Sequence, residues 1–374
     1  MRIVFFTETF LPATDGVVTR LRHTIEELAR MEDDMLVVSP RYPDGGPDSY
    51  AGAPIYRVPG VPFPPYPRIK LSFAHPGVGR VLRRFAPDLI HAVNPFILGP
   101  GGIYYARRLG VPLVASYHTN VAAYARYYNL GLGFDVGRWW TKQLHNRAEI
   151  NLCTSEAAMN YLLREGVKRI RLWPQGVDAR RFHPSKASKE WRERLSDGHP
   201  DDKLLLYVGR LAPEKDIERL KAIPREVPGT RLAIVGDGPA RGDLEREFRG
   251  APTVFTGVLQ GEDLASAYAS ADAFLFPSTT DTLGLAMLEA LASGLPVAAA
   301  RGGASHEIVS EGENGLLYEA NSVPSLIDAV RELFSEDGFR PALARRARAT
   351  AEVRDWRSST RTLRGYYEQA LGRQ

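Results

Sequence analysis

The sequence alternates short β-branched segments with amphipathic helical patterns, and it does so in two successive series. This alternation is typical of βαβ units, in which each helix returns the chain to the same edge of a parallel sheet. A chain of 374 residues has the length of two domains of ordinary size. The first series predicts strands at about 2–6, 35–39, 55–59, 88–92, 112–116, 149–153 and 169–172. The second predicts strands at about 203–208, 231–235, 252–255, 273–276, 296–299 and 316–318.

The expected fold class is therefore α/β, with two Rossmann-like domains that face each other across a deep cleft. The N-terminal domain is predicted to cover residues 1–180 and the C-terminal domain residues 181–355, with a linker at about 176–200. Residues 356–374 have a helical pattern and are expected to cross back to the first domain. The proline-rich residues 40–76 are expected to form a long irregular segment.

The composition is that of a soluble globular protein, with 44% hydrophobic and 25% charged residues. No stretch approaches the roughly 20 apolar residues of a membrane-spanning helix. The apolar N-terminus is short and is predicted to form a strand and not a signal peptide. The lone cysteine, Cys153, lies in an apolar strand, which indicates a buried thiol in a reducing compartment. A cytoplasmic protein is expected.

Positive charge is concentrated in the first half of the chain. Residues 1–180 hold 22 basic and 15 acidic residues, a net charge of +7, and the remaining 26 basic and 29 acidic residues give −3. This asymmetry favours an anionic partner for the N-terminal domain, either a membrane surface or nucleic acid. Ordinary solvated charge explains the count equally well.

The most specific segment, residues 277–290, joins an apolar strand to a helix that is expected to start near Leu283. Glu289 lies far enough into this helix to accept two hydrogen bonds from ribose hydroxyls, and Asp281 is placed to accept hydrogen bonds from a sugar. The alternative is a capping aspartate and a solvated helix glutamate. Backbone N–H groups at the helix start would suit a diphosphate. They belong to Thr282, Leu283 and Gly284.

This segment resembles that of the retaining glycosyltransferases of family 4, which have two facing Rossmann domains, the GT-B fold. Their hallmark is a pair of glutamates separated by seven residues. Here the spacing is kept, but the shorter Asp281 stands in the first position and Glu289 in the second. The resemblance implies a nucleotide-sugar donor held by the C-terminal domain and an acceptor held by the N-terminal domain.

Two cations and two glycines complete the predicted donor site. In the resembling family, the residues that match Arg210 and Lys215 neutralise the donor diphosphate, whose charge grows as the glycosidic bond breaks. A surface pair at a helix start is the alternative. Gly209 lies in the same segment and Gly238 follows the next strand, where a tight turn would also explain it. The full G-x-G-x-x-G fingerprint is missing after the first strand, which argues against a dinucleotide cofactor.

The first domain contributes two further candidates, each directly after a predicted strand. Gly16 would let the backbone approach the donor phosphate and sugar. His118 stands in a Tyr-His-Thr context at the sheet edge where open α/β sheets place their ligands. In the resembling family the matching histidine contacts the donor sugar near the reaction centre, although an isolated histidine is more often structural.

The sequence shows no pattern that requires a metal or a cofactor besides the nucleotide-sugar. It has no apolar strand followed by Asp-x-Asp, and no His, Cys and carboxylate cluster with ligand spacing. No nucleophile elbow is present either. In the resembling family, the leaving phosphate itself takes the acceptor proton, and the anomeric configuration is retained.

Within the family, the blocks at 255–257, 264–272 and 281–296 are most similar to sulfoquinovosyl diacylglycerol synthases, and bacterial mannosyl and glucosyl lipid transferases share many of them. This implies a lipid acceptor such as diacylglycerol and favours a UDP-sugar of the sulfoquinovose or glucose type, with GDP-mannose second. Residues 121–147 interleave aromatic and cationic side chains, which suits peripheral docking onto anionic headgroups. A buried helix pair is an equal alternative.

Two other classes of protein stay open. A nucleotide-sugar epimerase on the same scaffold would turn over the donor without an acceptor. A non-catalytic sugar-nucleotide binder, or a nucleic-acid module that uses the basic first half, is the second alternative. Nucleic-acid-binding motifs are missing, so a nucleic-acid partner is not expected.

Overall fold

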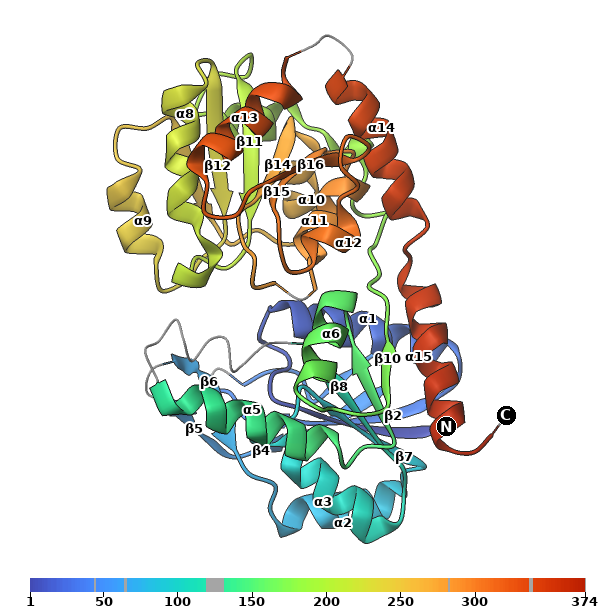
Figure 1. The fold of residues 1–374 in the computed structure, drawn as a ribbon. Coiled ribbons are helices and arrows are strands. Elements are labelled where there is room, and N and C mark those ends of the chain that lie inside the picture. Colours follow the sequence, from blue (N-terminus) through green and yellow to red (C-terminus); the bar gives the residue numbers. More distant parts are fainter. Residues whose placement is uncertain (44, 64–65, 119–130, 282, 336–338, 374) are drawn as a thin grey trace. The chain divides into compact units, whose positions relative to one another are not determined.

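A computed structural model describes the chain except for residues 44, 64–65, 119–130, 282, 336–338 and 374 (Figure 1). The chain divides into two compact units. Unit 1 comprises Met1–Gln175 and Trp356–Gln374, and unit 2 comprises Gly176–Asp355. Each unit is a Rossmann-like α/β domain built on a parallel sheet, which confirms the predicted fold class.

Unit 1 holds a sheet of eight strands in the order β10-β9-β8-β7-β1-β2-β4-β3. All neighbours pair in parallel except the short edge strand β3, which is antiparallel to β4. The strands are β1 (Arg2–Thr7), β2 (Asp34–Pro40), β3 (Ser49–Tyr50), β4 (Ala53–Val58), β7 (Leu89–Val93), β8 (Leu113–Tyr117), β9 (Ile150–Cys153) and β10 (Ile170–Leu172). Cys153 is buried, as predicted.

Helices cover both faces of this sheet, because successive residues of β1 point to opposite sides. Ile3 and Phe5 belong to a core shared with α1 and α15, and Val4 and Phe6 belong to a core shared with α2 and α3. The helices of unit 1 include α1 (Gly16–Arg30), α2 (Pro76–Phe85), α3 (Gly99–Leu109), α5 (Gly131–His145), α6 (Glu156–Arg164) and α15 (Trp356–Ala370).

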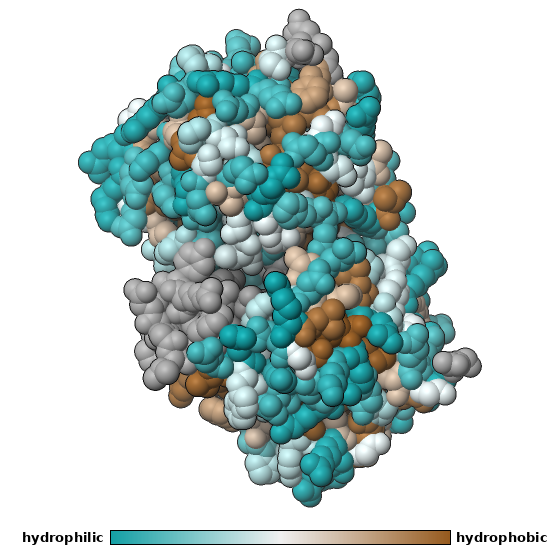
Figure 2. All heavy atoms as spheres, viewed as in Figure 1, coloured by the Kyte–Doolittle hydropathy of each residue, from teal (hydrophilic) through white to brown (hydrophobic). Residues whose placement is uncertain are grey.

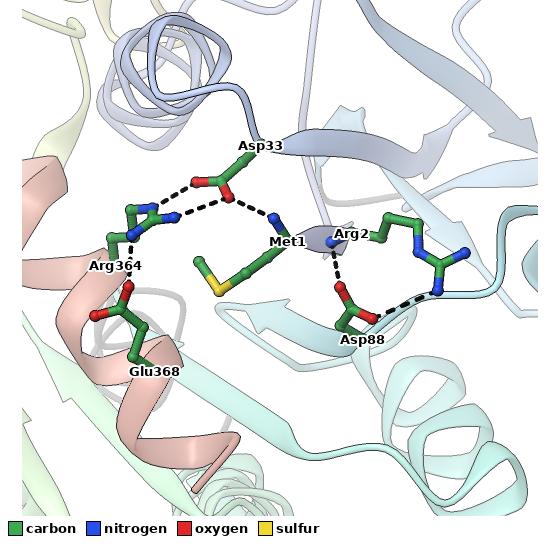
Figure 3. A network of polar contacts seen from close by, with 6 residues as sticks. All are labelled: Met1, Arg2, Asp33, Asp88, Arg364 and Glu368. Atoms are coloured by element: carbon green, nitrogen blue, oxygen red, sulfur yellow. Dashed lines mark hydrogen bonds and ion pairs between the residues drawn. The ribbon is translucent and has the colours of Figure 1, made fainter. Parts of the chain in front are cut away.

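The last helix, α15, is the predicted crossover helix, and it is tied to unit 1 by a polar network (Figure 3). Arg364 of α15 pairs with Asp33 at 2.9 Å and also with Glu368. The amino group of Met1 lies 2.6 Å from the same Asp33, whose side chain is only 1% exposed. A buried carboxylate needs such partners, so Asp33 fixes α15 against the start of β2.

Residues 40–76 are not the irregular segment that the prolines suggested. Besides β4, which was predicted at about 55–59, they contain β3 and a hairpin of two antiparallel strands, β5 (Gly60–Phe63) and β6 (Tyr66–Ser72). Proline is tolerated here because a two-stranded sheet consists only of edge strands, where a missing N–H breaks no central ladder. The prolines of this segment therefore do not prevent strand pairing.

Unit 2 holds six parallel strands in the order β13-β12-β11-β14-β15-β16. The strands are β11 (Lys203–Val208), β12 (Thr230–Val235), β13 (Thr253–Gly257), β14 (Ala273–Phe276), β15 (Val297–Ala300) and β16 (Gly315–Tyr318). The helices include α7 (Lys189–Leu195), α8 (Ile223–Glu226), α9 (Arg241–Glu247), α10 (Gly261–Ala269), α11 (Leu285–Ala292), α12 (Ser305–Ile308), α13 (Val323–Leu333) and α14 (Phe339–Glu352). Buried cores lie on both faces of this sheet as well.

The strand orders fix where each unit can bind a ligand. In unit 2 the first strand, β11, lies between β12 and β14, and in unit 1 the first strand, β1, lies between β2 and β7. The chain connections therefore diverge on the two sides of the first strand. Open α/β sheets bind ligands at this switch point, outside the carboxyl ends of the strands.

Candidate active site

The loops after β11 and β14 bring two predicted site residues together at the switch point of unit 2. Lys215 ends a 3-10 helix, Pro213–Lys215, that follows β11, and Asp281 lies in the loop after β14. The Lys215 ammonium donates to the Asp281 carboxylate at 2.6 Å. The Thr280 hydroxyl donates to the backbone carbonyl of Glu214 at 3.2 Å and joins the same two loops.

Arg210 lies at the same edge and is held by a carboxylate that the sequence reasoning missed. Its guanidinium pairs with the carboxylate of Glu214, whose side chain is fully buried. The Arg210 side chain itself remains 39% exposed. The missed signal was an acidic residue four positions after an arginine in a strand-to-helix loop. Glu214 orients Arg210 and leaves part of its guanidinium at the surface.

Helix α11 begins two residues later than expected, at Leu285, and Gly284 is its N-cap. Gly284 has φ of +60°, and a Cβ there would lie 2.5 Å from the Cδ1 of Ile308, so only glycine fits. In the part of the chain that the structure describes, no side chain caps α11, and its first turn has no acidic residue. Leu283 is buried, and Thr282 lies outside the described residues. An uncapped helix start offers N–H groups to an anion.

The predicted glycines Gly209 and Gly238 lie in adjacent loops after β11 and β12, and backbone hydrogen bonds join these loops. Gly209 N–H donates to the Val235 carbonyl at 3.0 Å, and Ala240 N–H donates to the Leu211 carbonyl at 2.9 Å. A Cβ on Gly238 would lie only 2.2 Å from that Leu211 oxygen. Gly238 therefore has a packing role that is independent of any ligand.

Glu289 is not a solvated helix glutamate. It lies half-buried on α11, where the Tyr268 hydroxyl of α10 donates to its carboxylate at 3.0 Å. Burial raises the pKa of Glu289 to about 7, although the hydrogen bond from Tyr268 and the charge of Arg181 oppose the shift. A carboxylate in this environment gains from any further hydrogen-bond donor.

In unit 1, Gly16 and His118 both lie at the carboxyl edge of the sheet, Gly16 as the first residue of α1 and His118 directly after β8. The first turn of α1 is already occupied by a carboxylate of the chain. Asp15 Oδ1 accepts from the N–H groups of Val17 and Val18, each at 2.9 Å. Those two N–H groups are committed to Asp15.

The start of α3 is occupied in the same way by Glu8, which the sequence reasoning did not single out. Its Oε1 accepts from four consecutive backbone N–H groups, those of Phe96, Ile97, Leu98 and Gly99, at 2.8–3.0 Å. Burial raises the pKa of Glu8, and these four hydrogen bonds oppose the rise. Carboxylates of the chain thus occupy two helix starts in unit 1, whereas α11 of unit 2 has no such cap among the described residues.

His118 is buried and is joined to other polar side chains of unit 1. Its Nε2 lies 2.8 Å from Ser116 Oγ, which also lies 2.8 Å from His91 Nε2. His91 Nδ1 lies 2.6 Å from the Tyr367 hydroxyl of α15. Burial holds the pKa of His118 well below its usual value, and the charge of nearby Arg20 adds to this shift, so the ring is neutral.

Comparisons with known proteins identify the family of the chain. The family model "Glycosyltransferase Family 4" matches residues 14–181, and "Glycosyl transferases group 1" matches residues 202–336. The sulfoquinovosyl transferase SQD2 of Arabidopsis thaliana is 38% identical over 97% of this chain and 72% of its own length. The chain belongs to glycosyltransferase family 4.

Other relatives of this glycosyltransferase differ in their donors and acceptors. A GDP-mannose-dependent alpha-mannosyltransferase of Mycolicibacterium smegmatis is 37% identical over 100% of this chain and 98% of its own length. An alpha-monoglucosyldiacylglycerol synthase of Streptococcus pneumoniae is 30% identical over 85% and 75% of the two chains. The solved structure of sucrose-phosphate synthase from Thermosynechococcus elongatus covers all of both chains with a TM-score of 0.85 and 21% identity, which shows the shared fold.

The aromatic region of the glycosyltransferase lies partly outside the described residues, namely Tyr124, Arg126, Tyr127 and Tyr128. In the described part, Trp139 of α5 is 57% exposed and Val136 is 61% exposed. Trp140 is half-buried, and its indole N–H donates to the Phe96 carbonyl at 2.8 Å. Trp139 is thus exposed, whereas the neighbouring Trp140 is held partly against unit 1.

Among the described residues of the glycosyltransferase, no group of three or more His, Cys, Asp and Glu side chains could hold a metal ion. No described helix is both long enough and apolar enough to cross a membrane. In unit 1, a cavity of about 410 Å³ is lined by Met31 at the end of α1 and by residues of α15, namely Arg357, Arg361, Arg364, Gly365 and Glu368.

The raised pKa of Glu289 predicts a pH-dependent stability. Between the unfolded value near 4.5 and the folded value of about 7, the folded chain binds more protons at Glu289, so stability falls as pH rises through this range. Replacing Glu289 with glutamine removes this cost and keeps an acceptor for Tyr268. We expect Glu289→Gln to be more stable than the wild type by up to about 3 kcal/mol at pH 8 and to lose this advantage by pH 4.5.

Urea unfolding of the full chain at pH 4.5, 6 and 8 measures this effect. The control is Glu313→Gln, because Glu313 is exposed and belongs to no ion pair of the described residues. A stability difference between Glu289→Gln and the wild type that does not change with pH would contradict the raised pKa.

Proposed function

We propose that this glycosyltransferase moves a hexosyl unit from a UDP-sugar of the sulfoquinovose or glucose type to a lipid acceptor such as diacylglycerol. Unit 2 binds the donor and unit 1 binds the acceptor. The main supporting observation is the set of groups at the switch point of unit 2. Arg210, the Lys215–Asp281 pair and the uncapped start of α11 offer cations and N–H groups to a diphosphate.

Each side chain at this edge has a proposed role. Arg210 and Lys215 neutralise the diphosphate, and Glu289 accepts hydrogen bonds from ribose hydroxyls. The backbone at Thr282, Leu283 and Gly284 binds phosphate oxygens. A diphosphate competes with Asp281 for the Lys215 ammonium, which frees the Asp281 carboxylate to bind hydroxyls of the sugar. In unit 1, Gly16 and His118 complete the donor-sugar contacts.

The proposed reaction proceeds with retention of configuration. The bond between the anomeric carbon and the diphosphate oxygen breaks, and the acceptor hydroxyl forms its new bond on the same face. The departing phosphate oxygen takes the hydroxyl proton, so no protein base is needed. Arg210 and Lys215 stabilise the growing negative charge, and a fixed cation is worth most where charge develops.

Two observations support a lipid acceptor on a membrane surface. Relatives include a synthase named for monoglucosyldiacylglycerol. Unit 1 holds 25 basic and 15 acidic residues, and unit 2 holds 23 basic and 29 acidic residues, so the positive excess belongs to unit 1.

The face in Figure 2 is mostly hydrophilic, with an apolar area over α6, where Leu163 is 54% exposed. We propose a cytoplasmic enzyme that docks peripherally through unit 1, with the exposed Val136 and Trp139 of α5 in contact with lipid.

A second donor is favoured by a specific observation. The mannosyltransferase that is 37% identical over the whole chain is named GDP-mannose-dependent. Its sequence identity to this chain is almost as high as the 38% of the sulfoquinovosyl transferase. The second candidate function is therefore a GDP-mannose-dependent alpha-mannosyltransferase that acts on a glycolipid.

A transfer assay tests these proposals. Labelled UDP-glucose, UDP-sulfoquinovose and GDP-mannose are each incubated with the enzyme in mixed micelles that contain no acceptor, diacylglycerol or a glycolipid. The lipid product and the free donor are both measured. We expect labelled glycolipid from a UDP-sugar only when the acceptor is present. Labelled glycolipid that forms from GDP-mannose and from neither UDP-sugar would favour the second candidate. Donor conversion that does not need an acceptor would indicate an epimerase, and no use of any donor would contradict both candidates.

A further inference from the structure

The cavity between α15 and the end of α1 is lined by three arginines. Its volume of about 410 Å³ is within the usual range of small-molecule sites. Arg357, Arg361 and Arg364 follow one another at intervals of four and three residues, so they lie on one face of α15. Met31, the C-cap of α1, lines the cavity from the neighbouring helix. All the residues that line the cavity belong to unit 1.

Arg364 is already neutralised by carboxylates of the chain (Figure 3). Its Nε and Nη2 donate to the Asp33 carboxylate, and its Nη1 donates to the Glu368 carboxylate. The amino group of Met1 also pairs with Asp33, so this network contains two cations and two carboxylates, whose charges balance. Glu368 is the single carboxylate among the described residues that line the cavity. The network therefore leaves no negative charge for the other two arginines.

Arg357 and Arg361 are exposed, and neither has an ion-pair or hydrogen-bond partner within the described residues. They stand four residues apart on one helix, where two like charges repel each other. Arg357 is also the second residue of α15, and a cation in the first turn is disfavoured by the positive end of the helix dipole. The helix thus carries two uncompensated positive charges at places where an anion from outside the chain would stabilise them.

Gly365 leaves room beside these arginines. It follows Arg361 by four residues and lines the same cavity. Glycine in the interior of a helix is less favourable than alanine. Packing does not require it here, because a Cβ on Gly365 would meet no heavy atom of the described chain within 4 Å. A larger side chain at this position would take up part of the cavity.

We propose that this cavity binds a ligand with a phosphate group, which Arg357 and Arg361 hold through their guanidinium groups. A guanidinium presents parallel N–H donors that match two phosphate oxygens, and such charge-assisted hydrogen bonds are stronger than neutral ones. Soluble phosphates and lipid headgroups share this chemistry, and separate binding measurements distinguish the two sources. The proposal goes beyond the transfer reaction, since none of these residues belongs to the proposed donor site.

Calorimetric titration of the full chain with inorganic pyrophosphate, in a buffer without phosphate, tests the soluble source. Arg210→Ala and Lys215→Ala are present in every sample, so failure of the proposed donor site does not affect the result. We expect one equivalent to bind, and Arg357→Ala combined with Arg361→Ala to weaken binding at least about tenfold. Gly365→Leu should weaken it by a similar factor, because the leucine side chain fills part of the cavity while both arginines are kept. Sedimentation with vesicles of phosphatidic acid and phosphatidylcholine tests the lipid source.

The matched control is Arg80→Ala combined with Arg84→Ala on α2, which also removes two exposed arginines four residues apart. Both double variants have the same net charge, so a difference between them reports a local site. Weaker pyrophosphate binding in the Arg357 and Arg361 variant alone supports a soluble ligand. No pyrophosphate binding, with weaker vesicle binding in that variant alone, supports a lipid headgroup. Equal behaviour of the two double variants with both probes, or unchanged binding by Gly365→Leu, overturns the proposal.

Discussion

Replacing both Arg210 and Lys215 with alanine is expected to lower sugar transfer by at least about a thousandfold. Both cations lie at the switch point of unit 2, where the leaving diphosphate gains charge in the proposed reaction. The loss should fall mainly on kcat, because these groups interact most strongly with the charge that develops in the transition state. The transfer assay with a saturating donor measures the effect.

The control for this pair is Lys221→Ala combined with Arg246→Ala, which removes two exposed cations of unit 2 that pair with surface carboxylates. This double variant should transfer sugar at the wild-type rate. Urea unfolding of both double variants shows whether the fold is kept. Transfer within a few-fold of the wild type by the Arg210 and Lys215 double variant, in a folded chain, would remove both residues from the mechanism.

Asp281 gives the second large expected effect. Asp281→Ala should lower kcat/KM by about a hundredfold, because it removes both the partner of Lys215 and the proposed acceptor for sugar hydroxyls. Asp281→Glu restores the glutamate that the family usually has at this position. Because glutamate keeps the charge and adds one methylene, this variant should retain transfer within about tenfold of the wild type.

The comparison of the two Asp281 variants distinguishes loss of the carboxylate from a change in its reach. Asp243→Ala on α9 removes an exposed carboxylate of unit 2 and should have no effect on transfer. If Asp281→Ala retained full transfer, the carboxylate would have no role in the reaction. If Asp281→Glu were as inactive as Asp281→Ala, the position would depend on the reach of aspartate and not on the family pattern.

The sequence alone was sufficient to predict the two sheets, because buried parallel strands are continuous apolar runs and the strands alternate with helices. The two Rossmann-like domains and the crossover helix α15 were predicted in this way. The hairpin of β5 and β6 was not predicted, since proline content alone cannot distinguish a loop from a hairpin of edge strands.

The sequence could predict that Lys215 and Asp281 lie at the same edge of one sheet, because each follows an apolar strand. In the structure these strands, β11 and β14, are neighbours, and the two side chains are in contact at 2.6 Å. Glu8 and Glu214 were missed. Each contacts groups that only the tertiary structure or a single tight turn brings within hydrogen-bond distance, and no local pattern marks such a carboxylate in the sequence.

Calorimetric titration with UDP, GDP and ADP shows whether unit 2 forms a site for a nucleoside diphosphate around Arg210 and Lys215. We expect the wild type to bind one equivalent of UDP more tightly than GDP or ADP. The Arg210 and Lys215 double alanine variant should bind UDP at least about a hundredfold more weakly. Equal affinity in the folded double variant, or no binding of any nucleoside diphosphate by the wild type, would contradict the presence of this site.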